Sequence, residues 1–190
     1  MQFSIFLTRA KQLAALVVLA SIGHSSYADS SYDAEGQRRA QSAGASLIGQ
    51  PGPAAVLKTL DGETIDLSKL YGKKPVYLKF WATWCVPCIK ELDAISDLYQ
   101  DWIEETGVSL IAVSVDDSRT VKRVKSLING KGWEYDILLD TNNDLKRALG
   151  ASSIPLTIVV KDNKIVYRHS GYSPGAEYEL YEKVKEYTSK

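Results

Sequence analysis

The sequence predicts an α/β fold, in which helices cover both faces of a central mixed β-sheet and a β-hairpin opens the domain. Three observations predict it. Short apolar runs of strand length alternate with segments whose apolar residues recur every three or four positions, the period of an amphipathic helix. Pairs of strand-like runs flank tight turns near both ends of the domain. Strands that alternate with helices and then form a hairpin favour a mixed sheet covered by helices.

The composition is that of an ordinary globular chain. Of its 190 residues, 45% are hydrophobic and 24% are charged, which argues against wholesale disorder, collagen and coiled coil and fits one domain. The 23 Lys and Arg residues balance the 23 Asp and Glu residues, so no nucleic-acid partner is expected. The only two cysteines, Cys85 and Cys88, lie in one four-residue segment, which excludes a disulfide framework across the fold.

Residues 1–28 have the three parts of a secretory signal peptide. Arg9 and Lys11 precede an apolar run over 13–23, and a small-x-small site ends at Ala28. As a helix, this 11-residue run would span about 16 Å, short of the roughly 30 Å of a bilayer core. We therefore expect cleavage after Ala28, export to the periplasm or another extracytoplasmic space, and no stable membrane insertion afterwards. A retained membrane anchor is the alternative.

The segment that follows is expected to be a flexible leader. Residues 29–50 are rich in Ser, Ala, Gly and Gln and hold few large apolar groups. Too little surface can be buried there to offset the cost of ordering the backbone. The 140 residues over 51–190 suffice for one hydrophobic core and form the predicted domain.

The domain is predicted to open with a hairpin and a buried strand. The runs 54–60 and 63–67 flank Asp61 and Gly62, a dipeptide suited to a tight turn. The apolar and aromatic run 76–82 has the length and composition of a strand.

A long helix, a second strand and a shorter helix are predicted next. Apolar residues recur at helical spacing from Val86 until Gly107, which predicts one helix over 86–107. The run 108–115 is a second buried strand. The spacing of apolar residues over 121–128 predicts a helix that stops before Gly130 and Gly132.

The last third of the chain supplies the remaining elements. A short strand is predicted over 135–140 and a short helix over 143–149. The runs 156–161 and 165–169 form a second hairpin, and an amphipathic helix over 177–190 closes the domain.

The two thiols lie where a strand ends and a helix begins, which favours redox chemistry. At the helix N-terminus, unpaired backbone N–H groups and the helix dipole favour the thiolate of Cys85, so we expect it to be the nucleophile. Cys88 lies almost one turn further on, within reach of Cys85 without backbone distortion, and is expected to resolve the mixed disulfide. Pro87 suits the first helical turn and stiffens the segment.

The sequence gives less support to two other roles of the thiols, a structural disulfide and a metal site. A structural disulfide across four residues closes too small a loop to stabilise the fold much. A zinc or copper site needs three or four ligands, whereas the chain after the signal segment offers these two sulfurs and one distant His169. We therefore expect no metal and no cofactor beyond the Cys85–Cys88 disulfide itself, and interpret His169 as a surface or edge residue rather than a catalytic base.

The segment from Lys79 to Cys88, K-F-W-A-T-W-C-V-P-C, followed by Ile89, Lys90 and Glu91, resembles the thioredoxin-like family, specifically its TlpA/ResA/DsbE branch of exported thiol-disulfide oxidoreductases. The resemblance covers roughly residues 47–190 and implies a thioredoxin-like fold. It also implies a cis-proline that faces the dithiol, matched here by Ile154 and Pro155. A cis bond there would leave the Ile154 backbone free to pair with a substrate strand. An ordinary trans-proline before a strand is the alternative.

Four further positions shape the expected chemistry. The resemblance implies that Glu91 is an acid of the active-site region, able to take the proton of Cys88, while a solvated helix residue is the alternative. Lys79 departs from thioredoxin, which has a buried aspartate at the matching place, so it either leaves proton transfer to Glu91 or water, or favours thiolate forms electrostatically. Leu156 departs from the threonine usual in this branch, which puts specificity in doubt. Trp84 offers an apolar surface to partners, with half-exposed packing as the alternative.

The resulting prediction is an extracytoplasmic thiol-disulfide oxidoreductase that reduces selected protein disulfides and is re-reduced by a membrane-bound thiol electron donor. The resemblance implies cytochrome c maturation or envelope redox homeostasis as its setting. The first alternative is the opposite direction, a disulfide-donating oxidase. The second is a non-enzymatic thiol chaperone or binding module that captures partners through the groove at Pro155.

Overall fold

The computed structural model describes residues 47–72 and 74–189. The predicted signal peptide over 1–28 and the leader up to residue 46 therefore lie outside the described residues. The helices and strands, in chain order, are β1 (Val56–Thr59), β2 (Thr64–Asp66), the 3-10 helix η1 (Leu67–Lys69), β3 (Val76–Trp81), α2 (Val86–Ser96), α3 (Tyr99–Thr106), β4 (Ser109–Ser114), α4 (Lys122–Lys131), β5 (Asp136–Leu139), α5 (Asp144–Ala148), β6 (Leu156–Lys161), β7 (Lys164–Ser170) and α6 (Ala176–Thr188).

The strands form one mixed sheet in the order β2-β1-β5-β4-β3-β6-β7. Strand β3 lies inside the sheet, parallel to β4 and antiparallel to β6, and every one of its residues is buried. Because β3 and β4 run parallel, their carboxyl ends meet at the same edge of the sheet. The predicted N-terminal hairpin is present, since β1 and β2 pair antiparallel, with Leu57 opposite Ile65.

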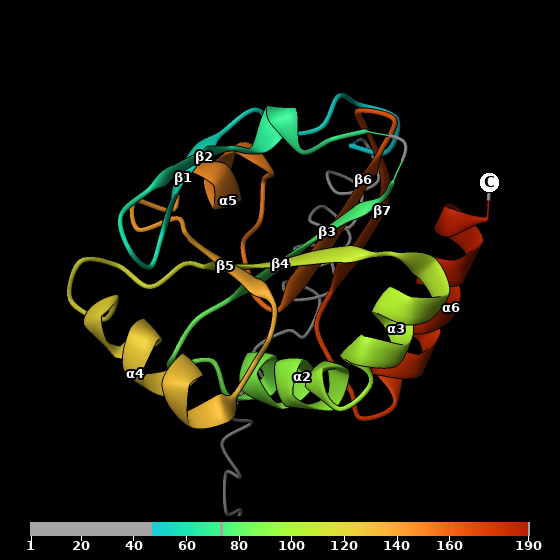
Figure 1. The fold of residues 1–190 in the computed structure, drawn as a ribbon. Coiled ribbons are helices and arrows are strands. Elements are labelled where there is room, and N and C mark those ends of the chain that lie inside the picture. Colours follow the sequence, from blue (N-terminus) through green and yellow to red (C-terminus); the bar gives the residue numbers. More distant parts are fainter. Residues whose placement is uncertain (1–46, 73, 190) are drawn as a thin grey trace, which may run out of the picture.

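Helices cover both faces of the sheet, which confirms the predicted fold class. Figure 1 shows α2 and α4 below the strands, α3 and α6 to their right and α5 above them. Helices α2, α3 and α6 contact one another. Trp102 of α3 is buried and stacks on Tyr181 of α6, with ring centroids 5.1 Å apart. No helix within the described residues has the length and hydropathy needed to cross a membrane.

The described structure begins earlier than the predicted domain. Residues 47–50, assigned by the sequence to the leader, form a turn against β7. The Gly49 backbone N–H donates to the carbonyl of Ile165 at 2.8 Å, and the Ile165 N–H donates to Gln50 at 2.8 Å. Leu47 packs against the core. These contacts satisfy the backbone that composition alone left without partners.

The predicted helix over 86–107 is in fact two helices. Helix α2 ends at Ser96 and α3 begins at Tyr99, because Leu98 between them adopts φ −115° and ψ −6°. Residues on both sides of the break still face the core, so the apolar spacing continues through it and hides it. A smaller difference concerns α4, which runs past Gly130 and ends at Gly132 in the left-handed conformation, φ 67°.

Candidate active site

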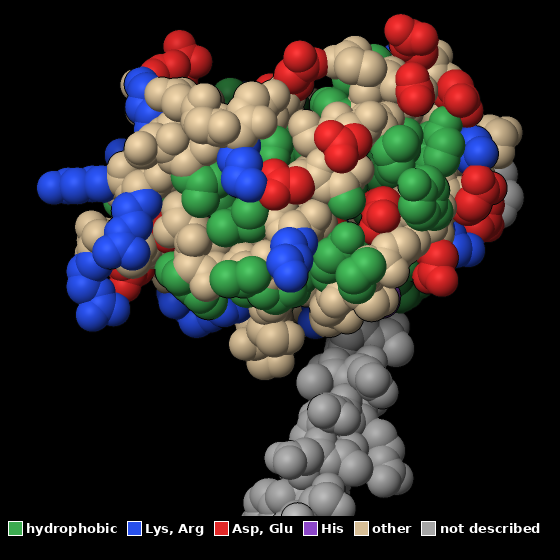
Figure 2. Space-filling view, turned by 90° about the horizontal axis from the view of Figure 1, so that it is seen from below, with side chains coloured by type: hydrophobic (Ala, Val, Ile, Leu, Met, Phe, Trp, Pro, Cys, Tyr) green, Lys and Arg blue, Asp and Glu red, His purple; other side chains and the backbone are tan. Residues whose placement is uncertain are grey.

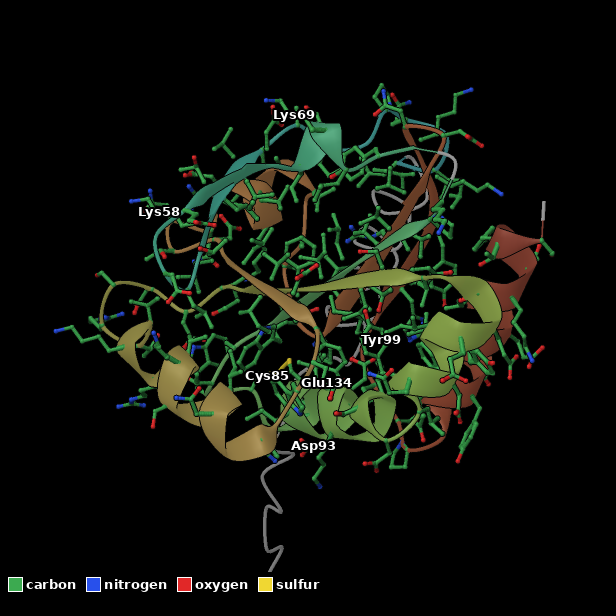
Figure 3. The ribbon with its side chains drawn as sticks, viewed as in Figure 1. Lys58, Lys69, Cys85, Asp93, Tyr99 and Glu134 are labelled. Atoms are coloured by element: carbon green, nitrogen blue, oxygen red, sulfur yellow. A yellow bond between two sulfur atoms is a disulfide. The ribbon has the colours of Figure 1, made fainter. Side chains whose placement is uncertain are left out.

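The two cysteines form a disulfide at the start of α2. Cys85 is the N-cap residue, in extended conformation, and Cys88 lies in the first turn, with their Cα atoms 5.3 Å apart. Cys88 has no exposed surface, whereas Cys85 keeps 6%. Figure 3 shows Cys85 at the end of α2 that lies nearest α4. Of the two sulfur-bearing residues, only Cys85 is therefore open to another molecule.

The neighbours of Cys85 combine a rigid support with an apolar surface. The buried strand β3 leads the chain to Ala82, whose carbonyl accepts the Cys85 N–H at 3.0 Å. Pro87 lies in the first turn of α2, where a missing N–H costs nothing. Trp84 and Val86 are 57% and 62% exposed, so the half-exposed alternative describes Trp84 correctly and leaves its indole open to contact.

A buried carboxylate holds the loop before the disulfide. Asp116, which follows β4, has no exposed surface. It accepts the Thr83 N–H at 2.8 Å, the Thr83 hydroxyl at 2.6 Å and the Ser114 hydroxyl at 2.9 Å. Sequence reasoning missed this pair. The available signal was a polar residue directly after a buried strand, at the sheet edge where β3 also ends.

Lys79 and Glu91 form a buried ion pair. Lys79 is 1% exposed and Glu91 is 4% exposed, so the interpretation of Glu91 as a solvated helix residue is wrong. The Lys79 ammonium also donates to the Thr157 hydroxyl at 2.6 Å. Burial lowers the pKa of Lys79, and the Glu91 carboxylate opposes this shift. The network joins β3, the active-site helix α2 and strand β6.

One oxygen of this network stays unsatisfied. Glu91 Oε1 accepts from Lys79, while Oε2 is buried and has no hydrogen-bond partner in the described part of the chain. A buried carboxylate oxygen without a donor is costly to leave unpaired. This oxygen is therefore available to accept a hydrogen bond or a proton. Glu91 lies three residues after Cys88, on the same side of α2.

The Ile154–Pro155 peptide bond is cis, so the trans alternative is wrong. Pro155 directly precedes β6, whose first residue, Leu156, lies opposite Phe80 of β3. The Pro155 carbonyl accepts the Gly171 N–H at 2.8 Å. The Ile154 backbone, by contrast, makes no hydrogen bond to any residue that the structure describes.

His169 lies apart from these groups. It is exposed near the end of β7, where its ring stacks on Tyr167 with centroids 6.4 Å apart. Over residues 47–72 and 74–189, no group of three or more His, Cys, Asp or Glu side chains is arranged to hold a metal ion. The absence of a metal and of a separate cofactor remains a prediction.

Comparison with known protein families identifies the family of this chain. The model of the AhpC/TSA family matches residues 48–169. The chain belongs to the AhpC/TSA family. Among curated members, the thiol-disulfide oxidoreductase ResA of Bacillus anthracis is 33% identical over 135 residues, which are 70% of this chain and 76% of that protein. This match confirms the resemblance to the TlpA/ResA/DsbE branch.

Solved structures agree with this AhpC/TSA assignment. A thioredoxin-like protein from Porphyromonas gingivalis, solved in solution, is 48% identical with a TM-score of 0.64, over 75% of this chain and 94% of that one. StoA from Bacillus subtilis is 25% identical with a TM-score of 0.57, over 68% of this chain and 95% of that one. The fold is thus thioredoxin-like, and the Cys85–Cys88 pair makes this member of the AhpC/TSA family a thiol-disulfide oxidoreductase.

Proposed function

We propose that the protein is exported and that it reduces selected disulfides of other proteins. The observation that carries the proposal is the unequal exposure of the dithiol. Cys85 caps the helix and keeps exposed surface, whereas Cys88 is fully buried behind it. This arrangement supports a first attack by Cys85 on a protein substrate and a second, internal attack by Cys88.

The two steps exchange one disulfide for another. In the reduced protein, the N–H groups at the start of α2 favour the Cys85 thiolate. This thiolate attacks one sulfur of the substrate disulfide, forms a mixed disulfide and releases the other substrate sulfur, which takes a proton from water. Cys88 then loses its proton and attacks the Cys85 sulfur, which releases the second substrate thiol. Two electrons pass to the substrate, and the Cys85–Cys88 disulfide forms.

Glu91 is the proposed acceptor of the Cys88 proton. It is buried, lies on the Cys88 side of α2 and has one oxygen free of hydrogen bonds in the described structure. Lys79 is the proposed positioning residue for Glu91, because its ammonium holds the other carboxylate oxygen. A buried carboxylate on the same side of the helix as a thiol can serve as its general base.

The substrate segment is proposed to lie between Trp84 and Ile154. Trp84 offers an exposed apolar surface beside Cys85. The Ile154 backbone is free of hydrogen bonds within the described residues, so a substrate strand can pair with it before Pro155 turns the chain into β6. Leu156 is buried, which makes it part of the support rather than of the contact surface.

Export and the electron source complete the proposal. The apolar segment over 13–23 and the site at Ala28 support secretion to the periplasm or an equivalent space. A reductant there needs electrons from the cytoplasm, so a membrane-bound thiol protein is the proposed donor. Apocytochrome c is a candidate substrate on the family resemblance, and a general role in envelope redox homeostasis is the broader form of the proposal.

The reduction potential of the Cys85–Cys88 couple tests the direction. We would equilibrate the protein with defined thiol/disulfide buffers and follow tryptophan fluorescence. Thioredoxin lies near about −270 mV and the oxidant DsbA near about −120 mV. A value below about −230 mV supports the reductase, whereas a value above about −150 mV contradicts it and assigns the protein as a disulfide donor.

A further inference from the structure

Helix α4 carries charge of one sign on its exposed face. Its ten residues include four basic side chains and no acidic one: Lys122, Arg123, Lys125 and Lys131. Val124 and Ile128 face inward and are buried. The helix is therefore amphipathic, with an apolar side on the core and a basic side toward solvent.

Helix α4 is fastened to α2 at its C-terminal end, and the loop that leads to α4 is tied to the loop before Cys85. In that loop Asp116, six residues before α4 begins, binds the Thr83 backbone and hydroxyl, two residues before Cys85. Just past the end of α4, the Trp133 indole donates to Asp93 of α2 at 3.0 Å, and Lys131 pairs with the same carboxylate at 2.6 Å.

The charges nearest the start of α4 are available to a partner. Lys122 and Arg123 are exposed and form no ion pair with any described residue. Lys125 contacts Asp61 at 3.1 Å, but both side chains are mostly exposed, and such a pair is weak and easily exchanged.

Acidic side chains gather on the opposite side of the same face of the molecule. Figure 2 shows Lys and Arg concentrated toward the left, where α4 lies, and Asp and Glu toward the right, where α3 and α6 lie. The exposed acidic residues of these two helices are Asp101, Glu104, Glu105, Glu179 and Glu182. The chain has no net formal charge, so the basic side is a local feature rather than an excess of positive charge.

We propose that α4 binds an acidic segment of the protein partner that exchanges disulfides with Cys85. The inference rests on the proposed oxidoreductase function and names the class of partner. An acidic segment is attracted to Lys122 and Arg123 and repelled by α3 and α6, which orients it across the exposed Trp84 and Val86. A protein rather than a membrane is favoured, because α4 is tied through Lys131 to the helix that carries Cys88, so a partner held on α4 lies on the same face of the molecule as the dithiol helix.

Matched disulfide peptides test the inference. Three fluorogenic peptides share one internal disulfide and differ only in four flanking residues, which are Glu, Gln or Lys. We expect the reduced protein to reduce the Glu peptide about fivefold to tenfold faster than the Gln peptide at low salt, and the Lys peptide more slowly than both. The differences should shrink at 0.5 M salt, where screening acts over about 3–5 Å.

Two double variants with equal charge change separate a local effect from a global one. Lys122→Glu/Arg123→Glu should abolish or invert the preference for the Glu peptide and leave the Gln peptide unaffected. Lys58→Glu/Lys69→Glu alters exposed lysines on the other side of the molecule (Figure 3) and should keep the preference.

The outcomes are distinct. Equal rates for the three peptides, or a preference that survives in Lys122→Glu/Arg123→Glu, would overturn the inference and leave the proposed function intact. Failure to reduce any peptide would contradict the proposed function and the inference with it. Binding of the wild-type protein to phosphatidylglycerol vesicles, without any peptide preference, would assign α4 to a membrane surface and overturn the inference.

Discussion

Thr83 and Asp116, 33 positions apart in the chain, meet through two hydrogen bonds at the carboxyl ends of β3 and β4. The Thr83 N–H and hydroxyl donate to the two oxygens of one buried carboxylate, at 2.8 and 2.6 Å. The loop that carries Trp84 and Cys85 is thereby tied to the strand beside it. The position of the nucleophile depends on a residue that lies outside the motif containing it.

Asp116→Ala is expected to destabilise the protein by about 1–3 kcal/mol, because it leaves the buried Ser114 hydroxyl and the partly buried Thr83 donors without an acceptor. Urea unfolding of the oxidised protein measures this loss. Asp61→Ala serves as the control, since its ion pair with Lys125 is exposed, and no measurable change is expected. Equal stability of Asp116→Ala and wild type would show that the loop is held by other contacts.

Lys79→Met is expected to cost about 3–5 kcal/mol at neutral pH, because it leaves the Glu91 carboxylate buried and uncompensated. Removing both charges in Lys79→Met/Glu91→Leu should restore much of the loss, since the pair is then replaced by apolar groups. A double-mutant cycle by urea unfolding measures the coupling. A double variant no more stable than Lys79→Met would contradict a direct pairing.

Glu91→Gln tests the proposed proton acceptor through a rate, at a denaturant-free condition where the variant, although destabilised by the unpaired Lys79, is shown to be folded. The internal attack by Cys88 should slow by about a hundredfold or more, since a general base contributes roughly 10²–10⁴-fold in rate. Stopped-flow fluorescence follows disulfide formation. In a Cys88→Ser background, attack of Cys85 on a small disulfide should proceed at the same rate with or without Glu91→Gln. A rate loss in that background as well would assign Glu91 to the first step instead.

Alkaline pH is expected to destabilise the protein through buried tyrosines. Burial raises the pKa of Tyr77 above its ordinary value of 10.0, so its stabilising contribution is complete below pH 10 and is lost as the pH rises. In this window, the loss amounts to about 1.4 kcal/mol for each pH unit and each such tyrosine.

Tyr77→Phe measures this contribution. The Tyr77 hydroxyl has no hydrogen-bond partner among the described residues, so the change should cost little at pH 8. Between pH 10 and 11, the variant should lose about 1 kcal/mol less than wild type in urea unfolding. Tyr178→Phe, which removes an exposed hydroxyl, is the control and should follow wild type. Parallel curves for all three proteins would refute the expectation.

Cys88→Ser should accumulate mixed disulfides through Cys85, because the attack that releases the substrate is missing. Non-reducing electrophoresis of envelope extracts, followed by mass spectrometry, detects them. Cys85→Ser/Cys88→Ser should trap none. If Cys88→Ser forms no adduct with any envelope protein, the proposed class of substrate is wrong.

The parts of the site that sequence predicted are those encoded locally. Cys85, Pro87 and Cys88 act through the start of a single helix, so spacing and a preceding strand sufficed. The pairing of Lys79 with Glu91 depends on how α2 packs on β3, and the pairing of Thr83 with Asp116 depends on the parallel register of β3 and β4. Neither relation has a signature in local spacing.

The distinction between local and long-range signals also explains which parts of the fold were predicted wrongly. Strand β6 was predicted with its observed bounds, since the proline before it and the turn after it delimit it. The break at Leu98 escaped detection because the apolar period continues across it. Residues 47–50 escaped because their order comes from backbone hydrogen bonds to β7, which side-chain composition does not reveal.

The complete burial of Cys88 has a kinetic consequence. Every partner, whether it gives or receives electrons, must form its mixed disulfide with Cys85. Donor and substrate therefore cannot be bound to the protein at the same time. Turnover is then a ping-pong cycle, with parallel lines in double-reciprocal plots. Donor and substrate that share one binding site also exclude each other, so an excess of either one inhibits turnover. The direction of electron flow is then expected to depend on the relative abundance of the partners as well as on their reduction potentials.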